Sequence, residues 1–214
     1  MKIIKNYIKN NQKEFIFLIS SIILFTKISI LVVTEKFNNI DSLTHSYILN
    51  IRNETLTTFF TTITNLAGAS FLLALSCLLF IILKNKKTAL YIFINLASAF
   101  TINETVKTIF TRSRPIGINL IEETGFSFPS GHSMISLAFY GFIGYLLYKN
   151  TKKKYMKPII IISTTSIILL IGISRIYLGV HYLSDIIAGF LLAIIYLNIY
   201  LKLIKLEKKW TIWK

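Results

Sequence analysis

Six long apolar runs divide this 214-residue chain, and they constrain its fold more than any other feature. The runs cover residues 15–33, 59–83, 88–110, 132–148, 158–174 and 182–201. A helix of about 20 apolar residues can cross a bilayer, where the backbone must satisfy its own hydrogen bonds. Because 54% of the residues are hydrophobic and the mean hydropathy is +0.63, an ordinary soluble domain is excluded. The sequence therefore predicts an all-α integral membrane protein with six transmembrane helices.

The segments between the runs contain no repeat and no low-complexity linker. We therefore expect residues 1–214 to form a single membrane domain. The basic N-terminus and the run 15–33 resemble a secretory signal, but the length of the run and the lack of a small-residue cleavage site favour a retained first helix. The single cysteine, Cys77, lies within an apolar run, so the chain forms no internal disulfide.

The basic residues lie mainly in short blocks between the runs, which indicates membrane topology and not a nucleic-acid-binding surface. An even number of spans puts both termini on one side of the membrane. Of the 24 Lys and Arg residues, 17 lie on that side, whereas the other side and the helix bodies hold seven basic and seven acidic residues. Because Lys and Arg mark cytoplasmic loops, both termini are predicted to be cytoplasmic.

The segment 41–58, between the first two runs, is too polar to cross a bilayer. It mixes apolar residues with Asp41, His45, Arg52 and Glu54. Its periodicity is that of a short amphipathic helix lying along the membrane interface. Such a helix would form a rim or lid above the outer surface, and a solvated connector is the alternative.

Three polar clusters are predicted to meet on the extracytoplasmic side of the bundle. They lie at residues 107–115, 128–132 and 175–185. The first ends the third run, where we expect Pro115 to stop the helix. The second opens the fourth run, and the third joins the fifth run to the sixth. Clusters that are distant in sequence thus converge on one face.

The third cluster contains a histidine and an aspartate at a reactive spacing. His181 and Asp185 are four positions apart, which puts them on one face of a helix. The Asp185 carboxylate can then hold one ring nitrogen of His181 and leave the other free. Arg175, six residues upstream of His181, adds a fixed positive charge. These groups suit chemistry on an anion.

All three clusters can contribute to binding if that anion is a phosphate. Ser130 and Gly131, at a helix start, offer a hydroxyl and unpaired backbone N–H groups. Lys107, Arg114 and Arg175 can surround the phosphoryl oxygens and stabilise the charge that spreads onto them in the transition state. We predict these five residues as phosphate binders.

Two histidines can divide the covalent and proton-transfer steps. His181 can attack phosphorus and form a phosphohistidine, while His132 protonates the departing oxygen and later activates water. A metal is the alternative use of His and Asp here. However, His45 has no ligand-like neighbours in sequence, and the surrounding cations would repel a metal ion. We predict neither a metal nor another cofactor.

Each of these residues also has an ordinary structural explanation, since a single His can cap a helix and a single Arg can anchor it at the interface. Their coincidence on one face favours a functional site, because ionisable groups at span ends are costly. Glu104, one turn before Lys107, is expected to pair with it. Three charged residues have no assigned role: Arg112, Glu122 and Glu123. A lipid-binding or channel-like protein that keeps an anion pocket is the non-catalytic alternative.

The clusters resemble the three motifs of the type-2 phosphatidic acid phosphatase superfamily, whose site is similar to that of vanadium haloperoxidases. The motifs are a Lys upstream of Arg-Pro, a Pro-Ser-Gly-His, and a Ser-Arg followed by His and Asp. Here they read Lys107 with Arg114-Pro115, Pro129-Ser130-Gly131-His132, and Ser174-Arg175 with His181 and Asp185. All three are complete and in order, which makes the resemblance specific.

The resemblance implies a metal-independent hydrolase of phosphomonoesters or diphosphates, with His181 as nucleophile, Asp185 as its orienting partner and His132 as general acid. It implies these phosphate binders: Lys107, Arg114, Ser130, Gly131 and Arg175. It also implies a lipid substrate in a bacterial cytoplasmic membrane, with the site facing outward. The short connection 115–129 leaves no room for a cap domain, which fits a lipid whose tail stays in the bilayer.

Bacterial members of this size act on several lipids, and undecaprenyl diphosphate is the substrate slightly preferred from the resemblance. Phosphatidylglycerophosphate, phosphatidic acid and lipid A are the alternatives. The expected partners are therefore the lipid substrate and the bilayer, with no nucleic acid. The sequence predicts no oligomeric state.

Overall fold

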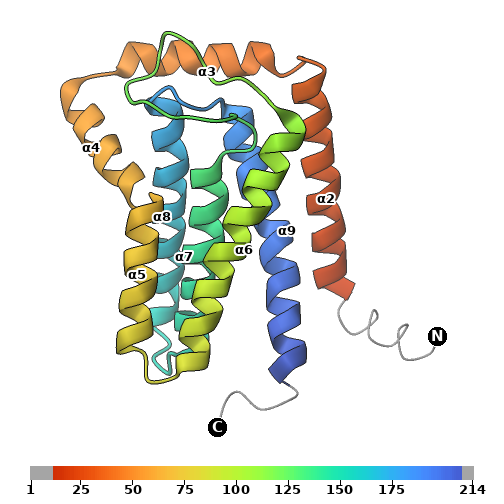
Figure 1. Ribbon diagram of the computed structural model, residues 1–214, viewed down its shortest axis with the longest axis vertical. Helices are drawn as coiled ribbons and strands as arrows, with labels where there is room; N and C mark the ends of the chain where they lie inside the picture. Colours follow the sequence, from red (N-terminus) through yellow and green to blue (C-terminus); the bar gives the residue numbers. More distant parts are fainter. Residues whose placement is uncertain (1–11, 209–214) are drawn as a thin grey trace.

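The computed structural model describes residues 12–208, and these are all-helical apart from the connecting loops (Figure 1). The helices are α2 (Gln12–Val33), α3 (Asn38–Ile51), α4 (Glu54–Asn65), α5 (Ala69–Ile82), α6 (Lys86–Phe110), α7 (Gly131–Asn150), α8 (Met156–Tyr177) and α9 (Leu183–Lys208). Most of them run along the long axis of the molecule, and α7 packs against α6, α8 and α9. The predicted all-helical fold is confirmed.

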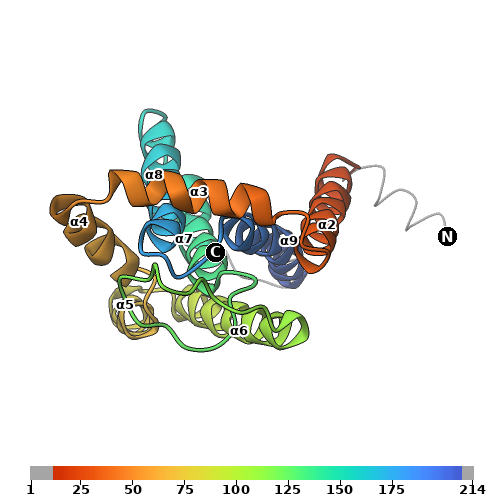
Figure 2. The ribbon, with the colours of Figure 1, turned by 90° about the horizontal axis from the view of Figure 1, so that it is seen from above.

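Helix α3 lies across one end of this bundle, nearly perpendicular to the long helices (Figure 1). Seen from above, it bridges the end from α2 to α4, and it contacts α8 and α9 (Figure 2). The loop 111–130 covers the same end. This end therefore brings together the C-termini of α6 and α8 and the N-termini of α7 and α9.

Four described helices are long and apolar enough to cross a membrane, namely α2, α6, α8 and α9 over Leu183–Lys205. The pair α4 and α5 passes the same test as one broken span, so up to five candidate spans are present among residues 12–208. Helix α7 covers the predicted run 132–148, but it is not among the candidates. The membrane fold is thus confirmed at four to five spans, and the sixth stays a prediction.

The predicted second span, 59–83, is not one straight helix. It divides into α4 and α5, which meet at 49°. The break lies at Gly68, whose extended backbone starts α5 instead of continuing α4. On α7, Tyr140 donates a 2.6 Å hydrogen bond to the carbonyl of Leu66, which satisfies an acceptor that the break leaves free.

The surface segment 41–58 is likewise not a single helix. Helix α3 ends at Ile51, and α4 begins at Glu54. The Asn53 side chain accepts a 2.9 Å hydrogen bond from the backbone N–H of Leu56, which caps the start of α4. A local cap therefore divides a segment whose apolar periodicity alone suggested one helix.

Helix α6 ends earlier than expected. It stops at Phe110 and not at Pro115, because Thr111 adopts a left-handed conformation (φ 46°) and its N–H bonds to the carbonyl of Lys107 at 3.0 Å. Lys107 consequently stays on the last turn of α6. Arg112 and Arg114 belong to the loop that follows, where their side chains can reach other elements.

Close helix packing sets the distance between α9 and α7. In a bilayer, packing of this kind rather than the hydrophobic effect holds helices together. The core-facing side chains of α7 include Met134, Phe139 and Phe142, each at most 2% exposed. A Cβ on Gly189 of α9 would lie 2.7 Å from the carbonyl oxygen of Ser130, so only glycine lets α9 approach the start of α7 this closely.

Candidate active site

All eight predicted site residues lie at the end of the bundle that α3 covers. Lys107 is on the last turn of α6, and Arg114 is in the following loop. Ser130, Gly131 and His132 form the start of α7. Arg175 lies on the last turn of α8, and His181 and Asp185 lie at the start of α9. The topology thus brings together three clusters that are up to 78 residues apart.

His181 and Asp185 are paired, although not for the predicted reason. Helix α8 ends at Tyr177 and α9 begins at Leu183, so His181 lies in the turn before the helix and does not share a helix face with Asp185. The turn still places His181 Nδ1 3.3 Å from Asp185 Oδ2. Both residues are almost completely buried, at 1% and 0% exposed.

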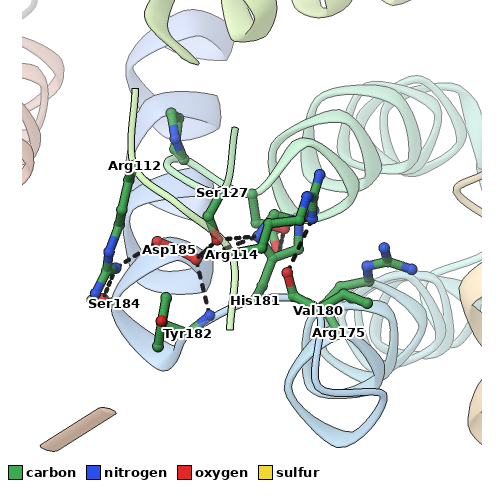
Figure 3. Close-up of polar contacts among 12 residues, drawn as sticks. Arg112, Arg114, Ser127, Arg175, Val180, His181, Tyr182, Ser184 and Asp185 are labelled. Carbon is green, nitrogen blue, oxygen red and sulfur yellow. Dashed lines mark hydrogen bonds and ion pairs between the residues drawn. The ribbon is translucent and has the colours of Figure 1, made fainter. Parts of the chain in front are cut away.

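The second ring nitrogen of His181 faces a cation (Figure 3). Nη1 of Arg114 lies 3.1 Å from Nε2 and also donates to the carbonyl of Val180. Because a guanidinium can only donate, Nε2 must be the unprotonated nitrogen and Nδ1 carries the proton toward Asp185. The Nε2 lone pair of His181 therefore points toward Arg114 and accepts its hydrogen bond.

The protonation of His181 follows from its surroundings. Burial lowers the pKa of His181 to about 4, and Asp185 only partly opposes this shift. The imidazole is therefore neutral at physiological pH, as a nucleophile must be. Arg114, which faces it, has a pKa lowered from the ordinary value by burial, yet a guanidinium stays charged.

Asp185 has three further partners besides His181. Ser127 donates to its Oδ2 at 2.5 Å, and the backbone N–H of Tyr182 donates to the same oxygen at 2.9 Å. Nη1 of Arg112 donates to Oδ1 at 2.7 Å. The carboxylate is thus held on every side, and both Ser127 and Arg112 are site residues that the sequence did not assign.

The start of α7 is the segment that the sequence predicts as an anion site. Ser130 is the N-cap residue, and its own N–H donates to the carbonyl of Asp185 at 3.0 Å. A Cβ on Gly131 would lie 2.9 Å from Asn103 Oδ1 and 3.7 Å from Lys107 Nζ. Glycine here lets the helix N-terminus, with its unpaired N–H groups, lie directly beside the Lys107 ammonium.

Two of the three predicted phosphate-binding cations, Arg114 and Arg175, converge on the carboxylate of Glu123. Arg175, which is fully buried, forms an ion pair with it through Nη2, and Arg114 lies 3.9 Å from its second oxygen. Lys107 pairs with Glu104 at 3.4 Å, as predicted. The positions around Glu123 are those where cationic groups would surround a phosphoryl group.

His132 opens α7 within the same set of charges. Its imidazole interacts electrostatically with Arg175, His181 and Lys107. It therefore lies near the phosphate binders and the paired histidine, where a group that transfers protons to a leaving oxygen is needed.

Helices α3 and α4 and the connection between them also hold the site. Arg52, between α3 and α4, donates from Nε and Nη2 to the carbonyl of Tyr177, at 3.1 and 2.7 Å. On α4, Thr64 Oγ1 accepts a 2.5 Å hydrogen bond from Arg175. On α3, His45 Nε2 lies 3.2 Å from the carbonyl oxygen of His181. The sequence indicates only that charged groups at a membrane surface need partners. It does not identify those partners.

Comparison with known proteins links this arrangement to one family. Residues 87–209 match the sequence model of the PAP2 superfamily. Phosphatidylglycerophosphatase B of Bacillus subtilis (strain 168) is 35% identical over 150 residues, which are 68% of this chain and 73% of that protein. Undecaprenyl-diphosphatase of Sulfolobus acidocaldarius is 33% identical over 123 residues, 55% of each chain.

Two solved structures share the fold. The crystal structure of the transmembrane PAP2-type phosphatidylglycerolphosphate phosphatase from Bacillus subtilis superposes with a TM-score of 0.81 and 30% identity, covering 88% of this chain and 96% of that one. Aquifex aeolicus LpxE superposes with a TM-score of 0.61 and 27% identity, covering 76% and 95%. The first structure extends the likeness beyond the matched region to most of the helices.

Proposed function

The chain belongs to the PAP2 superfamily, and from this premise we propose that it hydrolyses the phosphate of a membrane lipid through a phosphohistidine formed on His181. That it is a PAP2-type lipid phosphatase follows from the family and its named relatives. The observation that carries the covalent step is the placement of the two ring nitrogens of His181. Its Nδ1 faces Asp185, and its Nε2 lone pair faces the cations.

In the first proposed step, Nε2 of His181 attacks phosphorus, so that a P–N bond forms as the P–O bond to the leaving group breaks. His132 gives its proton to the departing oxygen. In the second step water attacks phosphorus, His132 takes a proton from that water, and the P–N bond breaks. Asp185 stabilises the imidazolium character that develops on His181 in both steps.

The remaining predicted residues would hold the phosphate in place. Lys107, Arg114 and Arg175 contribute positive charge, and the start of α7 contributes backbone N–H groups from Ser130 and Gly131. The phosphate would displace the Glu123 carboxylate from the two arginines. Preorganised cations of this kind stabilise charge on the transferring group without reorganisation during the reaction.

The topology belongs to the same proposal. We infer six spans within a single domain of residues 1–214, with α7 as the fourth span and the α4–α5 pair as a broken second span. Both termini would be cytoplasmic and the site would face outward from a bacterial cytoplasmic membrane. The charge distribution supports this orientation, since 17 of the 24 basic residues lie on the terminal side.

For the substrate, undecaprenyl diphosphate and phosphatidylglycerophosphate are the two leading candidates. Undecaprenyl diphosphate is preferred from the motif resemblance, and one relative is named for it. A relative with higher identity and a solved structure with a TM-score of 0.81 are named for phosphatidylglycerophosphate. Phosphatidic acid and lipid A complete the set of candidates.

A substrate panel tests the proposal. Purified protein in detergent, with a chelator present, is given each of the four lipids, and released phosphate is measured. We expect release from at least one lipid, at a rate that the chelator does not change and that vanadate, which mimics pentacoordinate phosphorus, inhibits. No release from any lipid would refute the assignment.

A further inference from the structure

A single arginine, Arg112, joins two buried carboxylates at the edge of the site. Figure 3 shows its contact with one of them, Asp185. Nη1 of Arg112 donates to Asp185 Oδ1 at 2.7 Å, and Nη2 donates to Asp41 Oδ2 at 2.9 Å. The two carboxylate side chains are 0% and 1% exposed. The guanidinium carbon of Arg112 lies 4.0 Å from the ring centroid of Tyr182, so a cation–π contact also holds one face of the guanidinium.

Asp41 ties the surface helix α3 to the start of α9. Its Oδ1 accepts from the backbone N–H of Ser184 at 3.0 Å, and its Oδ2 accepts from Ser184 Oγ at 2.7 Å. Because Ser184 lies in the first turn of α9, Asp41 satisfies a backbone donor that has no partner within that helix. Nη1 of Arg112 adds a 2.7 Å hydrogen bond to Ser184 Oγ. The residue before Asp185 is therefore fixed from α3.

The two carboxylate oxygens of Asp185 consequently have different hydrogen-bond partners. Arg112 occupies Oδ1, whereas Oδ2 faces His181, Ser127 and the N–H of Tyr182. A carboxylate held in this way can present only Oδ2 to the imidazole. It must also stay ionised to stabilise a positive imidazole, and a buried anion needs a paired cation. Arg112 is the cation in direct contact with Asp185 among the described residues.

We propose that Arg112 and Asp41 are positioning residues of the reaction, which keep Asp185 ionised and oriented toward His181 and make helix α3 part of the catalytic apparatus. The reaction itself is the one given under Proposed function, on which this inference rests. Asp41 sets the position of Arg112, and Arg112 keeps Asp185 ionised and oriented. Neither residue contacts the phosphate.

The sign of the electrostatic effect on His181 follows from the charges around it. The charged and titratable groups on the elements around His181 are these: Arg112, Arg114 and Glu123 in the loop, Asp41 and His45 on α3, Lys107 on α6, His132 on α7, Arg175 on α8 and Asp185 on α9. Replacing Arg112 by Gln leaves Asp41 and Asp185 without their shared cation. The site becomes more negative, which favours protonated His181 and raises its pKa.

Histidine-labelled NMR in detergent tests this inference without needing catalysis. The chain has three histidines, so replacing each in turn by Gln assigns the signals. We expect the pKa of His181 to rise by about one unit in Arg112→Gln, because Asp185, which contacts the imidazole, loses the cation that offsets its negative charge. In Asp41→Asn/Arg112→Gln the pKa should move back toward the wild-type value, because one uncompensated carboxylate is gone.

Kinetics on the lipid that the wild type hydrolyses provides the second readout. Arg112→Gln should lower kcat by roughly 100-fold with KM changed less than about threefold, because Arg112 acts on the His181–Asp185 pair and not on substrate binding. Arg112→Lys keeps the charge but cannot fork to both carboxylates, so it should retain an intermediate kcat. Ser42→Ala, on the exposed side of α3, is the matched control and should behave as wild type.

The outcomes separate the two proposals. A wild type that is inactive on every lipid, together with the expected NMR shifts, would sink the proposed function and leave the Arg112 bridge standing. An unchanged His181 pKa in a folded Arg112→Gln variant would overturn the bridge even if the wild type is active. If Arg112→Gln fails to fold, Arg112→Lys and Asp41→Asn supply the same comparison, and wild-type kinetics in both would also overturn it.

Discussion

His181 lies with each ring nitrogen facing a different charge, and this arrangement determines what the residue can do. Asp185 lies beside Nδ1, and Arg114 lies beside Nε2. A histidine flanked in this way has one defined tautomer, with its reactive lone pair held toward the cations. The geometry therefore suits nucleophilic attack better than a role in structure alone.

The acid limit of activity follows from the same burial. The pKa of His181 is lowered to about 4, and attack requires the neutral ring. We expect kcat/KM to hold as the pH falls from neutral to about 5 and to decline as it falls through about 4, because protonation removes the lone pair. The measurement is a pH profile with two substrates whose phosphate pKa values differ. The acid-side decline of kcat/KM that is due to His181 should occur at the same pH with both substrates. A decline near pH 6.5 with both substrates would argue against a neutral, buried nucleophile.

The sequence identified eight site residues but missed those that hold them, and the reason is physical. Each of the eight lies within a motif whose spacing can be seen along the chain. Arg112, Ser127 and Asp41 act through contacts to Asp185 or Ser184 that span 58 to 143 residues. Such contacts depend on how α3 and the loop cross the bundle, which no local pattern encodes.

At the scale of single elements, apolar periodicity located the helices, whereas local caps set their ends. The runs 88–110 and 158–174 lie within α6 and α8. The breaks were misplaced wherever one residue decides the backbone, as at Thr111 with its left-handed φ of 46° and at Gly68 between α4 and α5. The position of His181 was wrong for a similar reason, because α9 starts two residues after it.

The contact between α9 and α7 allows a test at this scale. A Cβ on Gly189 would lie 2.7 Å from the Ser130 carbonyl oxygen, which is backbone and cannot move aside cheaply. We expect Gly189→Ala to push the helices apart, to destabilise the protein by roughly 1–3 kcal/mol, and to lower kcat at least tenfold, because Ser130 and Asp185 are hydrogen-bonded across this contact. Thermal unfolding in detergent and phosphate release measure the two effects.

Gly141→Ala is the matched control on α7. Its added Cβ would lie 3.3 Å from Leu197 Cδ1 and 3.4 Å from Leu137 Cδ1, both of which are ends of flexible side chains. We expect near wild-type stability and activity for this variant. Equal behaviour of the two variants would show that the close approach of α9 has no special role in the site.

For the whole molecule, the charge distribution and the position of the site lead to one orientation. In the proposed topology the net charge of +15 is assigned to the terminal side of the membrane. The site lies at the end of the bundle that α3 covers. A site that faces outward at the membrane surface can take a lipid head group whose tail remains in the bilayer.

Cysteine labelling measures this orientation. In a Cys77→Ser background, Glu122→Cys lies in the loop that covers the site, and Lys153→Cys lies in the loop between α7 and α8 at the other end. In intact cells, we expect a membrane-impermeant maleimide to label the first variant, since the proposed topology places its loop outside the cytoplasm. The second should react only after permeabilisation. The reverse pattern would place the site in the cytoplasm.

Protein-bound phosphate is the most direct test of the central claim, that this PAP2 phosphatase works through a covalent intermediate on His181. The purified protein is mixed with radiolabelled lipid, quenched in base and analysed for phosphohistidine, which is base-stable and acid-labile. We expect label on the wild type. On His132→Ala the label should form more slowly, because the departing oxygen is not protonated, and should also decay more slowly, because water is not activated. Asp185→Asn should label roughly 1000-fold more slowly, since it misorients the imidazole.

His181→Ala gives the decisive comparison in this experiment. The account predicts a folded variant that carries no label and releases no phosphate, because the atom that attacks phosphorus is gone. Label retained on His181→Ala, or steady phosphate release from it, would contradict the account.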